Sequence, residues 1–237
     1  MCERATTGHS AAMTRVHIQL LGGFRLDLDH SPAHVVPGAR RLLALLALRD
    51  SPVPRQVAAT LLWPDATARR ASACLRSSLW RLAKPSTPLV VATEDALVLG
   101  EDVEVDFRRA CAFAAAPGAR PEAVGMLKAD LLPGWWQPWV QAERDWWWQA
   151  RLRALETLSD RFRSCGDHHH AHQAALAAVQ TDPLRESAHR TLVELHLADG
   201  NPAQAVRQYQ SYRRQLRAEL GLEPSAHIHE LVRPLLR

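Results

Sequence analysis

The spacing of hydrophobic residues changes from that of strands to that of helices early in the chain. The segment VHIQLLGGFRLDLD alternates apolar and polar residues around Gly22-Gly23. This alternation predicts a β-hairpin with strands at Val16 to Leu20 and Phe24 to Leu28. A third short strand is expected at HVVP, residues 34–37. The first elements of the chain are therefore predicted to be antiparallel strands.

Helical spacing follows the hairpin and then gives way to strands again. Leucines recur at helical intervals from Gly38 to about Arg49, and prolines then break the pattern. A short helix is predicted at 55–62 and a longer one at 68–84, which Pro85 stops. The segment PLVVATEDALVLG predicts two strands around a turn at Glu94-Asp95. Hairpin, three helices and closing hairpin are the order of a winged helix-turn-helix.

The second half of the chain is predicted to be entirely helical. Gly166, Gly200 and Gly221 stand where three of its helices should end, as C-cap glycines do. The expected helices lie near residues 106–116, 121–130, 138–165, 168–181, 185–199, 202–220 and 226–236.

A weak internal repeat runs through these helices at an offset of 34 residues, which is the period of tetratricopeptide repeats. The matching pairs are Ala154 with Ala188, Leu158 with Leu192, Gly166 with Gly200, and Ala171 with Ala205. We therefore predict an α+β winged helix-turn-helix followed by an all-α tetratricopeptide-like domain. The expected boundaries are a flexible tail at 1–14, a DNA-binding domain at 15–106 and a helical domain at 107–237.

Charge is unevenly distributed between these parts. The formal net charge of the whole chain is +4. Residues 38–84 hold nine Arg or Lys against two Asp, a net +7, which leaves −3 for the remainder. A basic segment within a mildly acidic chain indicates a surface that binds a polyanion.

The predicted helix 68–84 carries most of this charge on one side. On a helical wheel its apolar stripe consists of Ala71, Leu75, Leu79 and Leu82, and every cation falls on the other side. Solvated helix faces usually mix Glu with Lys, because pairing along the helix stabilises it. No acid occurs in these seventeen residues. DNA contact is therefore favoured over simple solvation, since a helix fits the major groove and Arg binds guanine or phosphate.

Docking geometry divides the candidate contacts along this helix. The N-terminal half of a recognition helix reaches the bases. Candidates for base or nearby phosphate contacts are Arg69, Arg70, Ser72, Ala73, Arg76 and Ser77. Candidates nearer the DNA backbone are Trp80, Arg81 and Lys84. Trp80 could equally pack under the wing, and the acids Glu94 and Asp95 at the wing tip would repel phosphate.

Six of the eight tryptophans fall between residues 135 and 148. On the predicted helix 138–165, one apolar stripe consists of Trp148, Leu152, Leu155, Leu158 and Phe162, with Trp147 at its edge. We interpret this stripe as a packing seam of the core, in preference to a ligand-binding site. Trp139 and Trp146 fall on the opposite face and are predicted to pack between the two domains. A membrane belt is not supported, because no apolar run approaches the roughly 20 residues of a membrane span.

No motif points to an enzyme, a cofactor or a metal. His168 and His172 stand at i, i+4, but no carboxylate or cysteine partner is evident nearby in the sequence. The chain contains no GxxxxGK, HExxH or GxSxG segment. The four cysteines stand alone, as buried thiols of a reducing compartment do: Cys2, Cys74, Cys111 and Cys165. We expect no metal, no cofactor and a cytoplasmic protein.

Several segments together resemble the SARP family of actinobacterial regulators. They are LLGGFRLDLD, ARRLLALLALR, LLWPD, RASACLRSSLWRL, LVLGEDVEVDF, LLPGWWQPWVQAERDWW and the long C-terminal stretch DPLRESAHRTLVELHLADGNPAQAVRQYQSYRRQLRAELGLEPS. The resemblance runs from about Val16 to the C-terminus. It implies a winged helix joined to a bacterial transcriptional activator domain. It also implies binding to direct DNA repeats near a promoter, recruitment of RNA polymerase and, often, control of a secondary-metabolite cluster.

Two further readings stay open at this point. The helical domain could be a protein-interaction scaffold beside a winged helix that binds DNA weakly or not at all. A repressor would carry the same residues, because activation and repression differ in where the site lies relative to the promoter. Double-stranded DNA is the expected partner, with a homodimer on DNA and association with the nucleoid when bound.

Overall fold

The computed structural model describes residues 15–83, 88–116, 118 and 120–236. The chain divides into two compact units, Met1–Asp106 and Phe107–Arg237, and each is described by itself. The tail expected at 1–14 and the candidate contact Lys84 lie outside the described residues.

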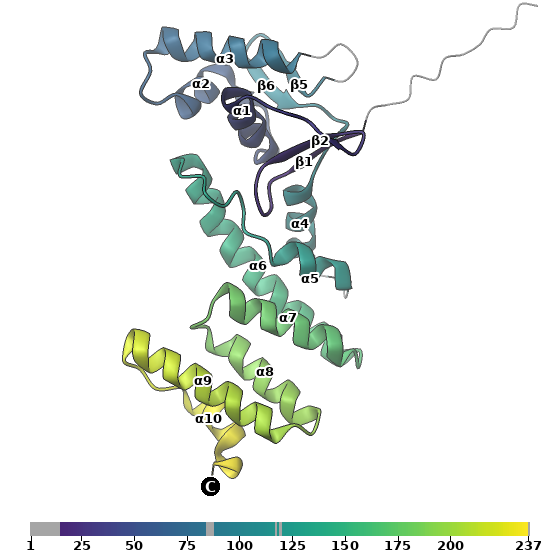
Figure 1. The fold of residues 1–237 in the computed structure, drawn as a ribbon, viewed down its shortest axis with the longest axis vertical. Coiled ribbons are helices and arrows are strands. Elements are labelled where there is room, and N and C mark those ends of the chain that lie inside the picture. Colours follow the sequence, from purple (N-terminus) through teal and green to yellow (C-terminus); the bar gives the residue numbers. More distant parts are fainter. Residues whose placement is uncertain (1–14, 84–87, 117, 119, 237) are drawn as a thin grey trace, which may run out of the picture. The chain divides into compact units, whose positions relative to one another are not determined.

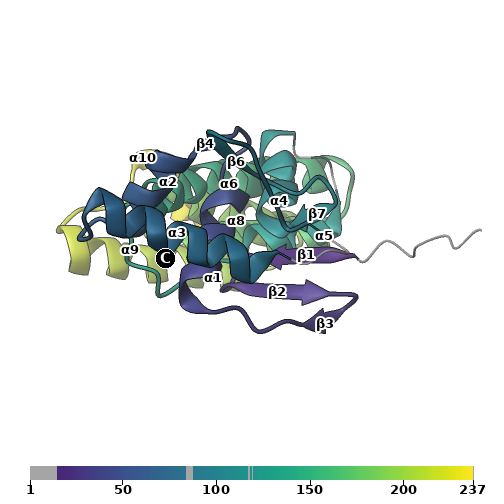
Figure 2. The same ribbon diagram turned by 90° about the horizontal axis from the view of Figure 1, so that it is seen from above.

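The first unit contains a four-stranded sheet of order β3-β2-β1-β7. Its members are β1 (Val16–Gln19), β2 (Arg25–Leu28), β3 (Ser31–Pro32) and β7 (Val103–Val105). The predicted hairpin is present, and β1 pairs antiparallel with β2 (Figure 2).

The third strand was expected at 34–37, and this prediction is wrong. Asp29 and His30 adopt positive φ angles of 48° and 64°, so the chain reverses immediately after β2. Ser31 can therefore pair with Leu28, and Val36 instead becomes the N-cap residue of the first helix.

Strand β7 was not anticipated from the sequence. It pairs parallel with β1, in a register that places Val16 opposite Val103. Its three residues alternate buried, exposed and buried. So short a segment shows no periodicity of its own, and its partner lies more than 80 residues away in the chain.

Three helices follow in the predicted order: α1 (Pro37–Ala47), α2 (Arg55–Leu62) and α3 (Ala68–Leu82). Helix α1 is the centre of this unit, since every residue from Leu42 to Ala47 is buried. A helix that is apolar all round must be covered all round. Figure 1 shows α2 and α3 beside it.

A second, three-stranded sheet has the order β4-β6-β5. The predicted closing hairpin is β5 (Val90–Ala92) and β6 (Ala96–Leu99). Strand β4 (Val53–Pro54) was not predicted, because Pro52 and Pro54 were interpreted only as helix breakers. Its place at the sheet edge explains why proline is tolerated there. The hairpin is thereby attached directly to the start of α2.

The second unit is helical throughout its described residues, as predicted. Its helices are α4 (Asp106–Ala115), α5 (Pro121–Leu127), α6 (Pro138–Ser164), α7 (His168–Thr181), α8 (Glu186–Ala198), α9 (Pro202–Leu220) and α10 (Ala226–Val232), with the 3-10 turn η1 (Arg233–Leu235). Helices α6 to α9 pack in succession (Figure 1), and α10 closes the last pair.

The 34-residue repeat corresponds to two helical hairpins, α6 with α7 and α8 with α9. Gly166, Gly200 and Gly221 follow helix ends with φ of 77°, 70° and 68°, which confirms their capping role. The six residues matched by the offset in helices are all buried: Ala154, Leu158, Ala171, Ala188, Leu192 and Ala205. Small buried residues at equivalent places let neighbouring helices approach closely.

The tryptophan-rich helix forms a core seam, with one change from the expected stripe. Leu152, Leu155, Leu158 and Phe162 are buried as predicted. Trp147, expected at the edge, is only 1% exposed, whereas Trp148 is half-buried. The indole N–H of Trp147 donates to the carbonyl of Ala129, 3.1 Å away, so this ring can be fully buried with its polar atom satisfied.

Trp139 and Trp146 both contact aromatic rings of their own unit. Trp139 is 6% exposed and meets Trp135 edge-to-face, with ring centroids 6.2 Å apart. Trp146 is 52% exposed and lies edge-to-face with Phe107 at 6.4 Å. Packing of this pair between the two units stays a prediction.

His168 and His172 have a carboxylate partner that the sequence did not reveal. Asp199 follows α8 and bonds both rings, with its Oδ1 2.6 Å from Nδ1 of His168 and its Oδ2 2.8 Å from Nε2 of His172. These contacts, to His172 first, lower the pKa of Asp199. No group of three or more His, Cys, Asp or Glu in the described residues could hold a metal ion.

Candidate nucleic-acid interface

Helix α3 is held in the first unit by one face. Its N-cap is Thr67, whose hydroxyl accepts from the backbone N–H of Arg70 at 3.4 Å. The buried residues are Ala71, Leu75, Ser78 and Leu82. Leu79, expected in this stripe, is only half-buried, and Ser78 takes its place because the start of α1 crosses α3 there.

The opposite face of α3 brings the predicted contact residues together. Ser72 is half-buried, and the remaining described candidates are exposed: Arg69, Arg70, Ala73, Arg76, Ser77, Trp80 and Arg81. None of these four arginine side chains has an ion-pair partner among the residues that the structure describes. These guanidinium groups therefore share one face of α3 without an ion-pair partner in the described part of the chain.

The first turn of α3 places charge where it does not help the helix. Arg69 and Arg70 lie at the helix N-terminus, and the first turn contains no acid. The N-terminal end of a helix dipole is positive, so a cation there costs about 0.3–1 kcal/mol. Local stability therefore does not explain these two residues, whereas contact with an anion would.

Trp80 is 79% exposed. The alternative in which it packs under the wing is therefore wrong. The indole lies on the outward cationic face, immediately before Arg81 and four residues after Arg76 in the sequence. Trp and Arg are the residues that contribute most at binding surfaces, because they supply large contact area and directed hydrogen bonds.

Arg55, the first residue of α2, belongs to the same region and was not among the predicted contacts. It lines a groove of about 330 Å³ between α2 and α3, together with Gln56, Thr60, Ser72 and Arg76. The sequence contained a signal for it, since Arg55 lies within the basic segment. Its position beside α3 follows only from the packing of the two helices.

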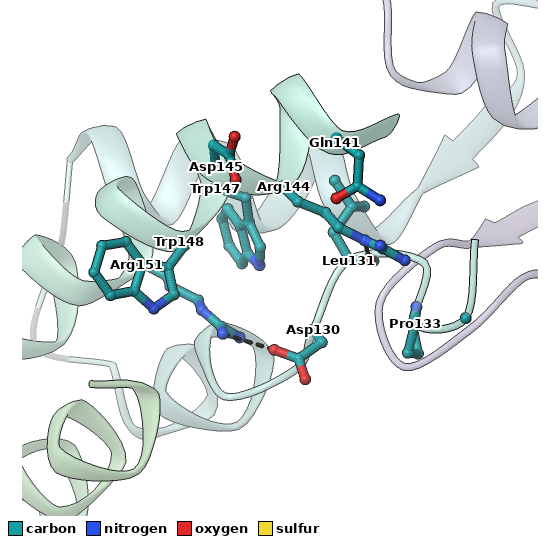
Figure 3. Close-up of a pocket in the computed structure, with 10 residues that line it drawn as sticks. Asp130, Leu131, Pro133, Gln141, Arg144, Asp145, Trp147, Trp148 and Arg151 are labelled. Atoms are coloured by element: carbon teal, nitrogen blue, oxygen red, sulfur yellow. Dashed lines mark hydrogen bonds and ion pairs between the residues drawn. The ribbon is translucent and has the colours of Figure 1, made fainter. Parts of the chain in front are cut away.

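The helical unit contains a separate cavity of about 360 Å³ between α6 and the connection that precedes it (Figure 3). Arg151 donates to the carbonyls of Lys128 and Ala129 and pairs with Asp130, with Nη2 2.6 Å from Oδ1. Arg144 donates to the carbonyl of Leu131 at 2.8 Å. These guanidinium groups satisfy carbonyls at the end of α5 and in the connection, so their role here is structural.

No helix in the described part of the chain is long and apolar enough to cross a membrane. The described cysteines, Cys74, Cys111 and Cys165, form no disulfide. The prediction that they are buried is wrong, because Cys74 and Cys111 are half-buried and Cys165 is exposed.

A winged helix-turn-helix followed by a tetratricopeptide-like helical domain defines a class of two-part transcriptional regulators. The family model of the bacterial transcriptional activator domain matches residues 105–236. The chain belongs to this family, and the resemblance to SARP regulators is confirmed.

Relatives extend the similarity across both units. The chain is 30% identical over 221 residues to the regulatory protein AfsR of Streptomyces coelicolor. It is 27% identical over 219 residues to AfsR of Streptomyces griseus. Each match covers 85% of this chain and 22% of the relative, so the chain spans about a fifth of the length of these proteins.

A solved structure shows the same fold. EmbR of Mycobacterium tuberculosis, in complex with a low-affinity phosphopeptide, superposes with a TM-score of 0.70. The match covers 94% of this chain and 65% of EmbR, at 21% sequence identity. The two-part architecture is therefore shared across low sequence similarity.

Proposed function

We propose that this regulator binds double-stranded DNA through the exposed face of α3 and activates transcription from a nearby promoter. The observation that carries the proposal is the set of four arginines on that face without an ion-pair partner among the described residues. An α-helix fits the major groove, where Arg binds the O6 and N7 atoms of guanine or nearby phosphates.

Contacts divide along α3 by their distance from its N-terminus. Arg69, Arg70, Ser72, Ala73, Arg76 and Ser77 reach base edges or adjacent phosphates. Trp80 and Arg81 lie towards the DNA backbone. Lys84, proposed from the sequence for a backbone contact, is outside the described residues. This assignment follows from the docking geometry of helix-turn-helix proteins, in which the N-terminal half of the recognition helix meets the bases.

Membership of the activator family supports the wider proposal. The protein binds direct repeats upstream of a promoter, as a homodimer on the DNA, and recruits RNA polymerase. Its targets include genes of a secondary-metabolite cluster. In the cell it is cytoplasmic and associates with the nucleoid when bound. It performs no reaction of its own and holds no cofactor.

Selection of binding sites from a random duplex library tests the proposal directly. We expect an enriched motif repeated in direct orientation. The logarithm of the binding constant for the selected duplex should fall linearly with the logarithm of the salt concentration. The slope should be steeper by about 0.9 for each phosphate contacted. Binding that is absent, or that does not change with salt, would instead favour the helical domain as a protein-interaction scaffold.

A promoter assay separates activation from repression. The selected site, placed upstream of a minimal promoter, should raise transcription by purified RNA polymerase in the presence of the protein. Loss of transcription from the same template would identify a repressor.

A further inference from the structure

We propose that Arg55 holds a DNA backbone phosphate at the mouth of the groove between α2 and α3, and that the wing turn positions Arg55 without contacting DNA itself. This inference rests on the proposed function and adds to it a contact and a role for the wing. It explains how a wing with an acidic tip serves a DNA-binding domain.

Two hydrogen bonds fix Arg55 to the wing turn. Its backbone N–H donates to the carbonyl of Asp95 at 2.9 Å. Its Nη1 donates to the carbonyl of Thr93 at 2.7 Å. Pro54, which immediately precedes it, pairs with Ala96 at the other end of the turn. Both the start of α2 and the guanidinium group are therefore held by the hairpin.

The turn that provides these carbonyls is itself closed by hydrogen bonds. The backbone N–H of Thr93 donates to the carbonyl of Ala96 at 2.9 Å. In return, the N–H of Ala96 donates to the hydroxyl of Thr93 at 3.1 Å. A turn closed from both sides presents its outward carbonyls in a fixed direction, so it can orient a long side chain at little further loss of entropy.

The other edge of the guanidinium group remains available. Nε and Nη2 of Arg55 have no hydrogen-bond or ion-pair partner among the residues that the structure describes. This edge presents two parallel N–H groups, the geometry that binds two oxygens of one phosphate. Arg55 is half-buried, so the group that would meet the phosphate is already partly ordered.

The groove beside Arg55 supplies the rest of the site. Arg76 and Ser72 of α3 line it, and so do Gln56 and Thr60 of α2. Two cations from different helices and the side-chain donors of Ser72 and Gln56, with no acid in the lining, match the charge and hydrogen-bonding needs of a phosphate diester. The hydroxyl of Thr60 already donates to the carbonyl of Gln56 at 3.0 Å. The groove adjoins the outward face of α3, so a helix in the major groove would bring a DNA strand to it.

The wing tip has the opposite charge. Glu94 and Asp95 are exposed at the end of the hairpin. A carboxylate against phosphate is repelled, and its repulsion would offset the contacts made by its neighbours. We therefore assign the wing turn a positioning role, exerted through its backbone carbonyls on Arg55.

Salt-dependent binding tests both halves of the inference in the full-length chain. The probes are a labelled random-sequence duplex and the duplex obtained by selection. Arg55→Gln keeps a donor for the carbonyl of Thr93 but removes the charge. We expect it to make the negative slope of log K against log salt shallower by about 0.9, because one phosphate contact is lost. Binding to both duplexes should weaken roughly tenfold. Arg55→Ala, checked for native circular dichroism, should behave in the same way.

Two controls make the result specific. Arg207→Ala removes one exposed cation from α9 in the other unit and should leave the slope unchanged. Glu94→Lys places a cation at the wing tip and should also leave the slope unchanged. If Glu94→Lys instead makes the slope steeper by about 0.9, the wing tip reaches a phosphate, which overturns the inference that the wing turn does not contact DNA.

The outcomes also separate this inference from the proposed function. A wild-type slope in Arg55→Gln, with DNA binding by the wild-type protein intact, overturns the phosphate contact alone. Absence of wild-type binding to either duplex overturns the proposed function and this inference together.

Discussion

A Cβ atom added to Gly38 of α1 would stand 2.9 Å from the Oγ of Ser78 on α3. Real Cβ atoms essentially never come so close to another heavy atom. The hydroxyl of Ser78 donates to the carbonyl of Cys74 at 3.0 Å, so its polar atom is satisfied within the helix. Glycine and serine at this crossing therefore set how closely the recognition helix packs on the central helix α1.

This pair gives the first prediction. Gly38→Ala should destabilise the chain by about 1 kcal/mol, because overpacking outweighs the gain in helix propensity. In the Ser78→Ala background the same substitution should be neutral or stabilising. Urea unfolding of the four proteins in a double-mutant cycle measures the coupling, which we expect to exceed about 0.5 kcal/mol. Additive effects would show that the two residues do not set the crossing.

Arg76→Ala and Arg81→Ala should differ in what they change. Arg76 lies where a side chain can reach base edges, so its loss should cost about 1–3 kcal/mol on the selected duplex and relax preference at one position. Arg81 lies nearer the helix end, so its loss should weaken binding to all duplexes alike. It should also make the slope of log K against log salt shallower by about one. Equal losses on selected and random duplexes for both variants would show that the proposed docking of α3 is wrong.

Neighbouring tryptophans of α6 provide a matched comparison of stability. Trp147→Ala should cost about 3–5 kcal/mol, because it removes a buried indole and leaves the carbonyl of Ala129 with one donor fewer. Trp146→Ala removes an exposed ring and one edge-to-face contact, so about 1 kcal/mol is expected. Denaturant unfolding of the full chain measures both. Similar costs would mean that Trp146 is covered by more than its contact with Phe107.

His189 predicts a pH dependence of stability. Burial lowers its pKa from the ordinary 6.5, against the opposing effects of its hydrogen bond to Pro183 and of Asp182. Its Nε2 lies 3.0 Å from the carbonyl of Pro183, which can only accept, so the neutral ring carries its proton there. The Nδ1 atom then accepts from the side-chain amide of Gln208 at 2.8 Å.

The sign of the effect follows from the depressed pKa in the folded state. The neutral ring contributes fully to stability above the unfolded pKa of about 6.5, and this contribution is lost as pH falls through the lower, folded pKa. The free energy of unfolding should therefore decrease on acidification below about pH 6.5. His189→Gln, whose amide can donate to Pro183 and accept from Gln208, should show a smaller decrease. An unchanged pH profile in that variant would contradict this assignment.

Much of this protein is determined by local sequence. Strand alternation around Gly22-Gly23, the recurrence of leucines from Gly38, and the glycines at 166, 200 and 221 each act over a few residues. Period, capping and chain reversal depend on backbone conformation and on which face of an element is apolar. For this reason the main helices and the two hairpins were predicted close to their observed bounds, and the cationic face of α3 was recognisable as a single surface.

Only the tertiary structure decided which of these elements meet. Strand β7 pairs with β1, although most of the sequence of the first unit separates them. Asp199 bonds two histidines of α7. Ser78 replaces Leu79 in the core because Gly38 lies against it. Arg55 joins the candidate DNA surface for the same reason, since the wing turn and α3 come to it from distant parts of the chain. Such contacts are selected by the shape and burial of the whole unit. No window of neighbouring residues contains that information.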